Sequence, residues 1–258
     1  MEYNKIKIDY DSWKDKLPSL KILHISDFHF SFNDPKAIEI INLIKGKEYD
    51  FCFLTGDYIK SIKAIKDCIK VVSKINTKNG TYAIWGNHDY RFDIKSLKKS
   101  LLANGVKLLV NQSDSIEYGK NLVNIIGLDV SVHDDVNPDV LKRGDMKKAL
   151  SGVNPGFNIL LSHSPDLIEE ASEKDIDLML SGHTHGGQVN FPIIGPVYAS
   201  SKFGIKYASG LFKEGKTRLF VTRGIGNVKV NLFGFSMKIP FSDIRFLCKP
   251  EVNEITIN

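Results

Sequence analysis

The chain has few cysteines and no long apolar run, and each absence excludes a class of protein. Its 258 residues include three widely spaced cysteines (Cys52, Cys68 and Cys248) and no CxxC pair, so neither a disulfide framework nor a thiolate zinc site is supported. No stretch reaches the roughly 18 uninterrupted apolar residues of a membrane span, and the first residues lack the apolar core of a signal peptide. We therefore expect a soluble protein of a reducing compartment, the cytoplasm.

The sequence also lacks linkers, low-complexity tracts and internal repeats, so we expect one domain over residues 1–258. With 42% hydrophobic and 25% charged residues, the composition is that of an ordinary globular protein and not of a collagen-like, coiled-coil or disordered one. The net charge of +5 comes largely from lysine. Residues 61–76 predict a helix with an apolar side and a solvated lysine face, so this excess does not indicate a nucleic-acid partner.

Five short apolar runs are each followed by polar residues that include Asp, Asn or His. The runs are 21–26, 51–54, 82–85, 158–161 and 176–180. Runs this short and apolar predict buried strands, and helical patterns at 33–44, 61–76, 93–104 and from 164 onward separate several of them. This alternation predicts a largely parallel sheet whose carboxyl edge collects the polar residues. After His185 the alternating segments 217–221 and 254–257 predict a second sheet, or the far half of a sandwich.

The polar residues at that edge are those of a metal site. They are Asp27, His29, Asp57, Asn87, His88, Asp89, His163, His183 and His185. Imidazoles mixed with carboxylates suit divalent Mn, Fe, Co, Ni or Zn, and the set exceeds one tetrahedral site, so we expect two ions that share a carboxylate. In an extended segment, residues two apart would point the same way and clamp an ion together. The two remaining histidines are expected elsewhere: His24 in the core and His133 in an exposed acidic loop.

These motifs carry a family resemblance. Asp-x-His, Gly-Asp, Gly-Asn-His-Asp, a later single His and Gly-His-x-His, in this order over Lys21 to Gly226, resemble the calcineurin-like metallophosphoesterase superfamily. The resemblance implies an α/β fold, a four-layer αββα sandwich of two mixed sheets flanked by helices. It also implies an enzyme that hydrolyses a phosphate ester with two divalent ions, Mn²⁺, Fe²⁺/Fe³⁺ or Zn²⁺, of which Mn²⁺ is favoured.

The resemblance further implies a role for each motif residue. Asp27, His29, Asp57 and His185 would hold the first ion. Asp57, Asn87, His163 and His183 would hold the second, with Asp57 as the bridge. A hydroxide between the ions would attack phosphorus in line, His88 would protonate the leaving group as general acid, and Asp89 would orient His88.

The downstream motifs are similar to those of one bacterial branch. Gly-His-Thr-His-Gly-Gly-Gln at 182–188, with 192–196, 207–212 and 222–226, resembles a phosphodiesterase-like branch that includes UDP-diacylglucosamine pyrophosphatases. This implies a small phosphodiester or diphosphate substrate with a lipid or nucleotide-sugar part. Tyr58 and Asp89 depart from the pattern of Ser/Thr protein phosphatases, and Lys60 stands where purple acid phosphatases have tyrosine. The length leaves little room for the capping domain of DNA-repair exonucleases.

Other readings stay open from the sequence. A metal-stabilised interaction scaffold that lacks catalysis is one alternative, and a nucleic-acid phosphodiesterase is another. The apolar segment 228–241 could be a lipid-facing loop at a membrane surface, although an ordinary hairpin is favoured. Lys60, Arg91 and Arg223 could contact substrate phosphate or serve the structure alone. Nothing in the sequence indicates the oligomeric state.

Overall fold

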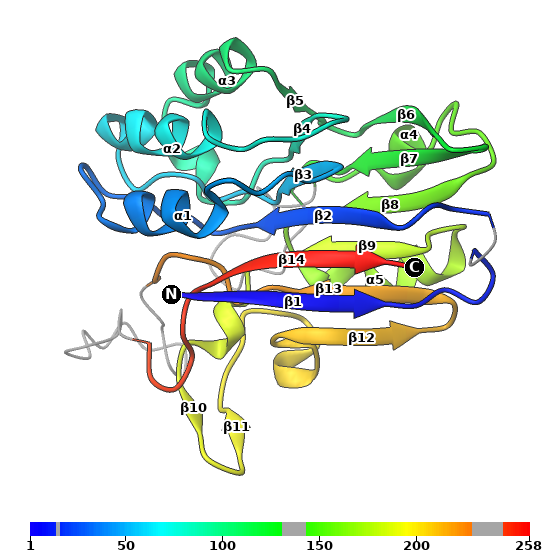
Figure 1. The fold of residues 1–258 in the computed structure, drawn as a ribbon. Helices are drawn as coiled ribbons and strands as arrows, with labels where there is room; N and C mark the ends of the chain where they lie inside the picture. The colour runs from blue at the N-terminus through cyan, green and yellow to red at the C-terminus, as the bar shows by residue number, and fades with distance from the viewer. Residues whose placement is uncertain (14–15, 131–142, 229–244) are drawn as a thin grey trace.

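Two six-stranded sheets face each other in the part of the chain that the computed structural model describes, residues 1–13, 16–130, 143–228 and 245–258 (Figure 1). The first sheet has the order β1-β14-β2-β3-β4-β5 and the second β12-β13-β9-β8-β7-β6. The strands of the first are β1 (Glu2–Ile8), β2 (Leu20–Ile25), β3 (Phe51–Leu54), β4 (Thr81–Ala83), β5 (Val106–Leu108) and β14 (Glu251–Ile257). Those of the second are β6 (Gln112–Tyr118), β7 (Asn121–Gly127), β8 (Phe157–Leu161), β9 (Leu178–Ser181), β12 (Gly210–Glu214) and β13 (Thr217–Val221).

Helices complete the four layers. On the first sheet pack α1 (Lys36–Ile44), α2 (Ile65–Val72) and α3 (Ile94–Ala103), and on the second α4 (Met146–Ala149) and α5 (Ile168–Glu173). The single turns are η1 (Ile62–Ala64), η2 (Asp89–Arg91), η3 (Pro165–Leu167), η4 (His185–Gly187) and η5 (Gly204–Tyr207), and a small ribbon pairs β10 (Asn190–Phe191) with β11 (Gly195–Pro196). This is the predicted αββα sandwich.

The strands separate three apolar layers because their side chains alternate. In β3, Phe51 and Phe53 enter the core between the sheets, whereas Cys52 and Leu54 face the helices of the first sheet. In β9, Leu178 and Leu180 join the central core and Met179 faces the outer layer. Strands buried on both faces read as continuous apolar runs, which is why the sequence located them. Each such side chain contributes roughly 1.5–3 kcal/mol by its burial.

The helices lie where the sequence predicts them, but the apolar pattern does not fix which of their residues are buried. In α3, Leu97 and Leu101 are buried, and the Asp93 carboxylate caps the first turn. In α1, however, Ile40 is buried and Ile38 is 45% exposed. The lysine-faced segment buries Cys68, Val71 and Val72 in α2, while Ile65 and Ile69 pack against the same core partly buried and Ile62 stays exposed. Packing against the sheet selects the buried side, and a helix rotates by about 100° per residue, so one position changes the face.

The sequence misplaces the division between the two sheets. The second sheet does not start after His185 but at β6, so β2, β3 and β4 belong to the first sheet while β8 and β9 belong to the second. The last strand, β14, returns to the first sheet between β1 and β2 (Figure 1). Long-range pairing fixes strand order, and local patterns do not encode it. The consequence is that polar residues converge from the ends of strands in both sheets.

Two of the sequence predictions concern residues outside the described part of the chain. The segment 228–241 lies outside the described residues except for Val228, and His133 lies outside them entirely. His24 is fully buried, as predicted, and its Nε2 lies 2.9 Å from the Thr55 Oγ1. Among the described residues, none of the helices combines the length and the apolar composition that crossing a membrane would require.

Candidate metal centre

The predicted site residues follow the carboxyl ends of five strands. Asp27 and His29 come after β2, Asp57 after β3, Asn87, His88 and Asp89 after β4, His163 after β8, and His183 and His185 after β9. Apart from His88, which is partly exposed, each of these nine residues is buried. Ligands bind beyond the carboxyl edge of α/β sheets because the loops there are free to vary. The two sheets therefore bring all nine residues to one region.

The backbone at these residues is not extended, contrary to our expectation. Asp27 and His29 have φ angles of 53° and 43°, Asp57 has 58°, and His183 and His185 have 68° and 51°. Residues other than glycine rarely adopt this left-handed region, and each instance costs of order 1–3 kcal/mol. The strained positions are therefore concentrated at the candidate ligands, a distribution typical of functional sites.

Glycines let the chain approach the two carboxylates closely. A Cβ on Gly182 would lie 2.2 Å from the Asp27 Oδ2, and one on Gly86 would lie 2.2 Å from the Asp57 Oδ1. Both distances are far below van der Waals contact, so any side chain there would displace the carboxylate. The Gly-His and Gly-Asn motifs thus need glycine for space beside the site.

Asp27, His29 and His185 form one group of candidate ligands. One ligand atom from each lies within 4.8 Å of the others. His185 Nε2 lies 3.6 Å from the Asp27 Oδ1, and the rings of His29 and His185 are 5.1 Å apart. The Asp27 carboxylate also accepts the backbone N–H of His183 at 3.1 Å, which ties the β2 loop to the β9 loop.

Asp57 lies between two sets of histidines. Its Oδ2 is 3.3 Å from the His29 Nε2 and 3.4 Å from the His163 Nε2. Its Oδ1 accepts the backbone N–H of His88 at 2.8 Å, which fixes the carboxylate plane. A carboxylate with one free oxygen shared by two imidazoles is placed as a bridging ligand would be.

The second set surrounds His163. Its Nδ1 lies 2.6 Å from the Thr55 carbonyl oxygen, which requires a proton on Nδ1 and leaves Nε2 as the free lone pair of the neutral ring. That Nε2 lies 3.0 Å from the Asn87 Oδ1, and the His183 ring lies 5.0 Å away, edge to face. Ligating histidines are usually oriented by a carbonyl on their other nitrogen in this way.

The electrostatics of the site call for a cation. Burial and the repulsion from Asp57 raise the pKa of Asp27, whereas Asp57, despite its burial, has its pKa held well below the usual range by His163, His88 and His29. Burial alone would lower the pKa of His163, but Asp57 raises it to about 10. Without an ion, the His163 ring must therefore carry an additional proton to lie this close to the oxygens that it faces.

The unpartnered atoms support the same conclusion. Among the described residues, four buried side-chain nitrogens lack a hydrogen-bond partner, and three of them belong to this site: both ring nitrogens of His29 and the Nε2 of His183. Buried polar atoms are nearly always satisfied, and an imidazole nitrogen without a proton is satisfied by a metal ion. The residues present thus fit divalent ions. Burial also lowers the pKa of His183 to about 3, which keeps its ring neutral and able to ligate.

His88 and Asp89 differ in their positions. His88 sits at the open side of the site, with its ring 4.9 Å from that of His29, and burial lowers its pKa to about 4. Asp89 was expected to orient His88, but its hydrogen bonds go to the backbone. Its carboxylate accepts the N–H groups of Asp57, Tyr58 and Gly86 at 2.8–2.9 Å. Burial and the nearby Asp57 raise its pKa to about 7.

Sequence reasoning missed Arg245. This half-buried guanidinium lies 3.1 Å from the His185 Nδ1 and donates to the carbonyls of Arg223 and Gly226 at 2.6 and 2.5 Å. It thereby holds the loop that covers Asp27 and His29. The loop lies so close to these two residues that added Cβ atoms on Gly224 and Gly226 would collide with them. Arg245 lies outside every motif, so no signal in the sequence marked it.

Arg223, considered as a phosphate contact, serves the structure. Its guanidinium donates to Glu251 at 2.6 Å and to Glu2 at 2.7 Å, and so joins the β13 loop to β14 and β1. Lys60 and Arg91 are exposed, and their part in binding stays a prediction.

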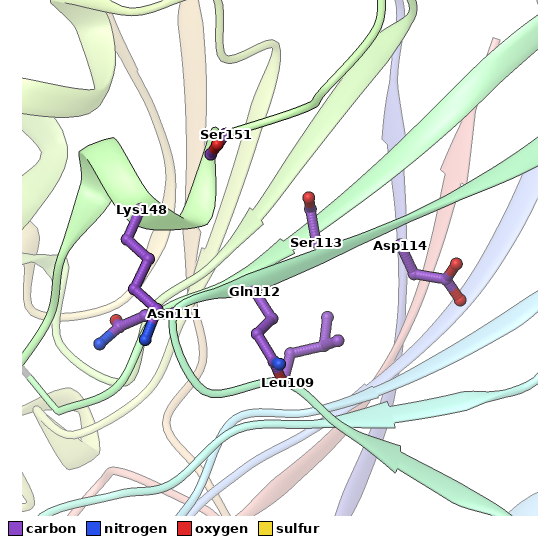
Figure 2. Close-up of a pocket in the computed structure, with 7 residues that line it drawn as sticks. All are labelled: Leu109, Asn111, Gln112, Ser113, Asp114, Lys148 and Ser151. Atoms are coloured by element: carbon purple, nitrogen blue, oxygen red, sulfur yellow. The ribbon is translucent and has the colours of Figure 1, made fainter.

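A hollow of about 430 Å³ lies elsewhere on the surface, lined by Leu109, Asn111, Gln112, Ser113, Asp114, Lys148 and Ser151. Figure 2 shows Lys148 extending from α4 toward Asn111 beside β6. None of the nine predicted site residues lines it, and those residues lie at the strand ends instead.

Comparison with known proteins identifies the class to which this site belongs. Residues 20–187 match the calcineurin-like phosphoesterase family, and the chain belongs to that family. Like its family, it is a metal-dependent phosphoesterase. The match ends at Gly187, just past His185, and so includes every predicted site residue.

Two relatives align over nearly the whole chain. The uncharacterized metallophosphoesterase YkoQ of Bacillus subtilis is 31% identical over 245 residues, which are 90% of this chain and 86% of that protein. The phosphodiesterase YaeI of Escherichia coli is 27% identical over 255 residues, 95% of this chain and 84% of its own.

Solved structures share the fold at low sequence identity. The NAD nucleotidase of Haemophilus influenzae is 20% identical with a TM-score of 0.52, and a putative 5'-nucleotidase of Staphylococcus aureus is 15% identical with the same TM-score. The two alignments include 82% and 80% of this chain but only 46% and 49% of the nucleotidase chains. They support the fold alone.

Proposed function

We propose that the chain hydrolyses a phosphodiester or a diphosphate and that the seven candidate metal ligands and His88 carry the roles expected from the motifs. The observation that carries the proposal is the position of the Asp57 Oδ2, 3.3 and 3.4 Å from imidazole nitrogens of two separate sets. Under the proposal, Asp27, His29 and His185 hold one ion, Asn87, His163 and His183 hold the other, and Asp57 bridges them. Mn²⁺ is the expected metal. Two bound ions supply a hydroxide at neutral pH and neutralise charge on the phosphoryl oxygens.

The protein's own residues then position and protonate. His88 is the most open of the site histidines and lies beside His29, where a leaving oxygen can reach it. An anionic phosphoester next to the ring favours its protonated form, which is the form that a general acid needs. Asp89 holds the backbone that carries Asp57 and Tyr58, and in this way keeps the bridging carboxylate in place.

The relatives and the motif run at 182–188 support the proposed substrate class. A protein named as a phosphodiesterase aligns over 95% of this chain. We therefore favour a diester or diphosphate over a monoester, with a lipid-linked or nucleotide-sugar compound as the particular substrate.

All three cysteines are free and buried, in agreement with a reducing compartment such as the cytoplasm.

The test compares a chromogenic phosphodiester with the matching monoester in the presence of Mn²⁺ and in the presence of a chelator. UDP-diacylglucosamine and glycerophosphodiesters form the second panel. The proposal expects turnover with Mn²⁺, none with chelator, and a preference for the diester. Asp57→Asn is expected to lose activity and bound metal together, whereas Asp114→Asn, on the surface beside Lys107, keeps both. Full turnover by Asp57→Asn would exclude the bridging role.

His88 is tested separately from the ligands. His88→Asn is expected to lower the rate by about 10²–10⁴-fold, the usual contribution of a general acid, while both ions stay bound. The loss is expected to shrink for substrates whose leaving group needs no proton. A variant that loses metal instead would show that His88 is a ligand, in keeping with the group that it forms with His29 and Asp57.

A further inference from the structure

The ribbon of β10 and β11 carries an exposed apolar tip. Figure 1 shows this ribbon projecting beyond the body of the fold. At its tip Ile193 is fully exposed, Ile194 is 72% exposed, and Val197 at its base is 50% exposed. Eight of the twelve large exposed apolar side chains of the described residues lie between residues 191 and 247, so the tip is part of a concentration.

A second loop extends the same apolar surface. Phe246 bridges to Val189 next to the ribbon, its backbone exchanges hydrogen bonds with Gln188 and Asn190 at 2.8 and 2.9 Å, and its ring lies 6.0 Å from that of Phe191. Leu247, the next residue, is 60% exposed. The ribbon and this loop thus form one surface, which we call the apolar ribbon: Phe191, Ile193, Ile194, Val197, Phe246 and Leu247.

The backbone at the tip is strained around Ile193. Its φ is 71°, and the N–H of Ile194 donates to the carbonyl of Pro192 at 2.8 Å, which makes a γ-turn with a β-branched residue at its centre. A positive φ is an outlier for such a residue, and glycine or asparagine would fit better. No packing of the described chain requires the isoleucine, because its side chain is fully exposed. Its use therefore has to be sought outside this chain.

Charge identifies the partner. Residues 178–213 contain no Asp or Glu but include Lys202, Lys206 and Lys213. Lys202 and Lys206 remain 42% and 59% exposed, although each approaches a glutamate. The apolar tip has no acidic member, and lysines follow it in the chain. This combination suits the interface of an anionic lipid bilayer, where apolar side chains enter the acyl boundary and cations meet headgroups.

We propose that the apolar ribbon docks this protein on an anionic lipid membrane. The docking surface does not depend on the proposed function. It would nevertheless bring the metal centre to the headgroup layer, because η4 carries His185 and the ribbon begins immediately after it, at Asn190. The partner is the lipid phase itself, and the proposed surface consists of described residues alone.

Vesicle co-sedimentation tests the proposal without turnover, in chelator. Wild-type protein is mixed with vesicles of phosphatidylcholine and with vesicles of equal parts phosphatidylcholine and phosphatidylglycerol. We expect binding to the anionic vesicles, weaker binding to the neutral ones, and a decline with salt. Ile193→Asn is expected to reduce binding about tenfold or more, the contribution of one buried isoleucine. Ile62→Asn, at a 52% exposed isoleucine on η1, is the control and should bind as wild type does.

The Ile193 variant keeps the test decisive because asparagine tolerates a positive φ. Ile193→Asn is expected to melt at or above the wild-type temperature and to hydrolyse a soluble phosphodiester as wild type does. Wild-type protein that stays in the supernatant with both vesicle types would overturn the proposal. Equal binding by wild type and Ile193→Asn would also overturn it. So would a dimer in light scattering that Ile193→Asn dissociates, since the surface would then be a contact between copies.

Discussion

Asp57 and Asp89 hold each other's loops in place. The Asp89 Oδ2 accepts the backbone N–H of Asp57 at 2.9 Å, and the Asp57 Oδ1 accepts the backbone N–H of His88, next to Asp89, at 2.8 Å. The two acidic residues therefore divide the work. Asp89 serves the backbone alone, whereas Asp57 keeps its second oxygen directed at His29 and His163.

Replacing Asp89 by asparagine removes one acceptor from this arrangement. Three backbone amides converge on the carboxylate, and an asparagine would turn an NH₂ group toward at least one of them. We expect Asp89→Asn to lower the free energy of unfolding by about 1–3 kcal/mol, measured by urea denaturation in chelator. Asp93→Asn, at the start of α3, is the control and should change little because asparagine also caps helices. Wild-type stability in Asp89→Asn would refute the backbone role.

Replacing Gly182 by alanine should disturb the metal centre without changing the identity of any candidate ligand. Its Cβ would lie 2.2 Å from the Asp27 Oδ2, so Asp27 must move. We expect Gly182→Ala to retain roughly one fewer ion per chain, measured by elemental analysis of the purified protein. Gly46→Ala, at a φ of 71° in open space, controls for simple destabilisation of about 1 kcal/mol and should keep its metal. Full metal content in Gly182→Ala would mean that Asp27 is not a ligand.

Arg245 acts through His185 and is a positioning residue. Its guanidinium donates to several carbonyls of the loop and faces the His185 Nδ1 at once, which a lysine cannot do. Because Arg245 anchors the loop over Asp27 and His29 through those carbonyls, we expect Arg245→Lys to weaken metal affinity about 10–100-fold, as the loss of a group that positions a ligand does, with excess Mn²⁺ restoring most of the activity. Arg218→Lys on β13 is the control. A rate loss that excess metal does not restore would indicate a different role.

The burial of His24 predicts that the free energy of unfolding falls in acid. Burial lowers the pKa of His24 to about 3 from an unfolded value near 6.5. Below pH 6.5 the unfolded chain takes up a proton that the folded chain refuses, so stability present above that pH is lost as the pH falls toward 3. Between pH 6.5 and 4.5 this amounts to about 2–3 kcal/mol. His24→Gln, which keeps a donor toward Thr55, should lose that much less over the same range in chelator, as measured by urea unfolding. Identical pH profiles would contradict the prediction.

Local patterns could predict the strands and the polar residues that end them. β3 reads Phe-Cys-Phe-Leu and runs into Thr-Gly-Asp, so both its burial and the position of Asp57 are local properties. The helix faces were less certain, because Ile38 and Ile40 are both apolar and only contact with the sheet decides which is buried. The role of Asp89 was also missed, because its partners are backbone amides and every residue except proline carries one.

Apolar runs and their polar ends are neighbours along the chain, so the amino-acid sequence alone indicates which side chains are available and that each follows a buried strand. Tertiary structure decided that β2–β4 and β8–β9 belong to different sheets whose ends meet at one site. It also decided the left-handed backbone of Asp27 and His183 and the arrival of Arg245 behind His185. The physical reason is that these features depend on contacts between residues far apart in the chain, whose energies no local pattern records.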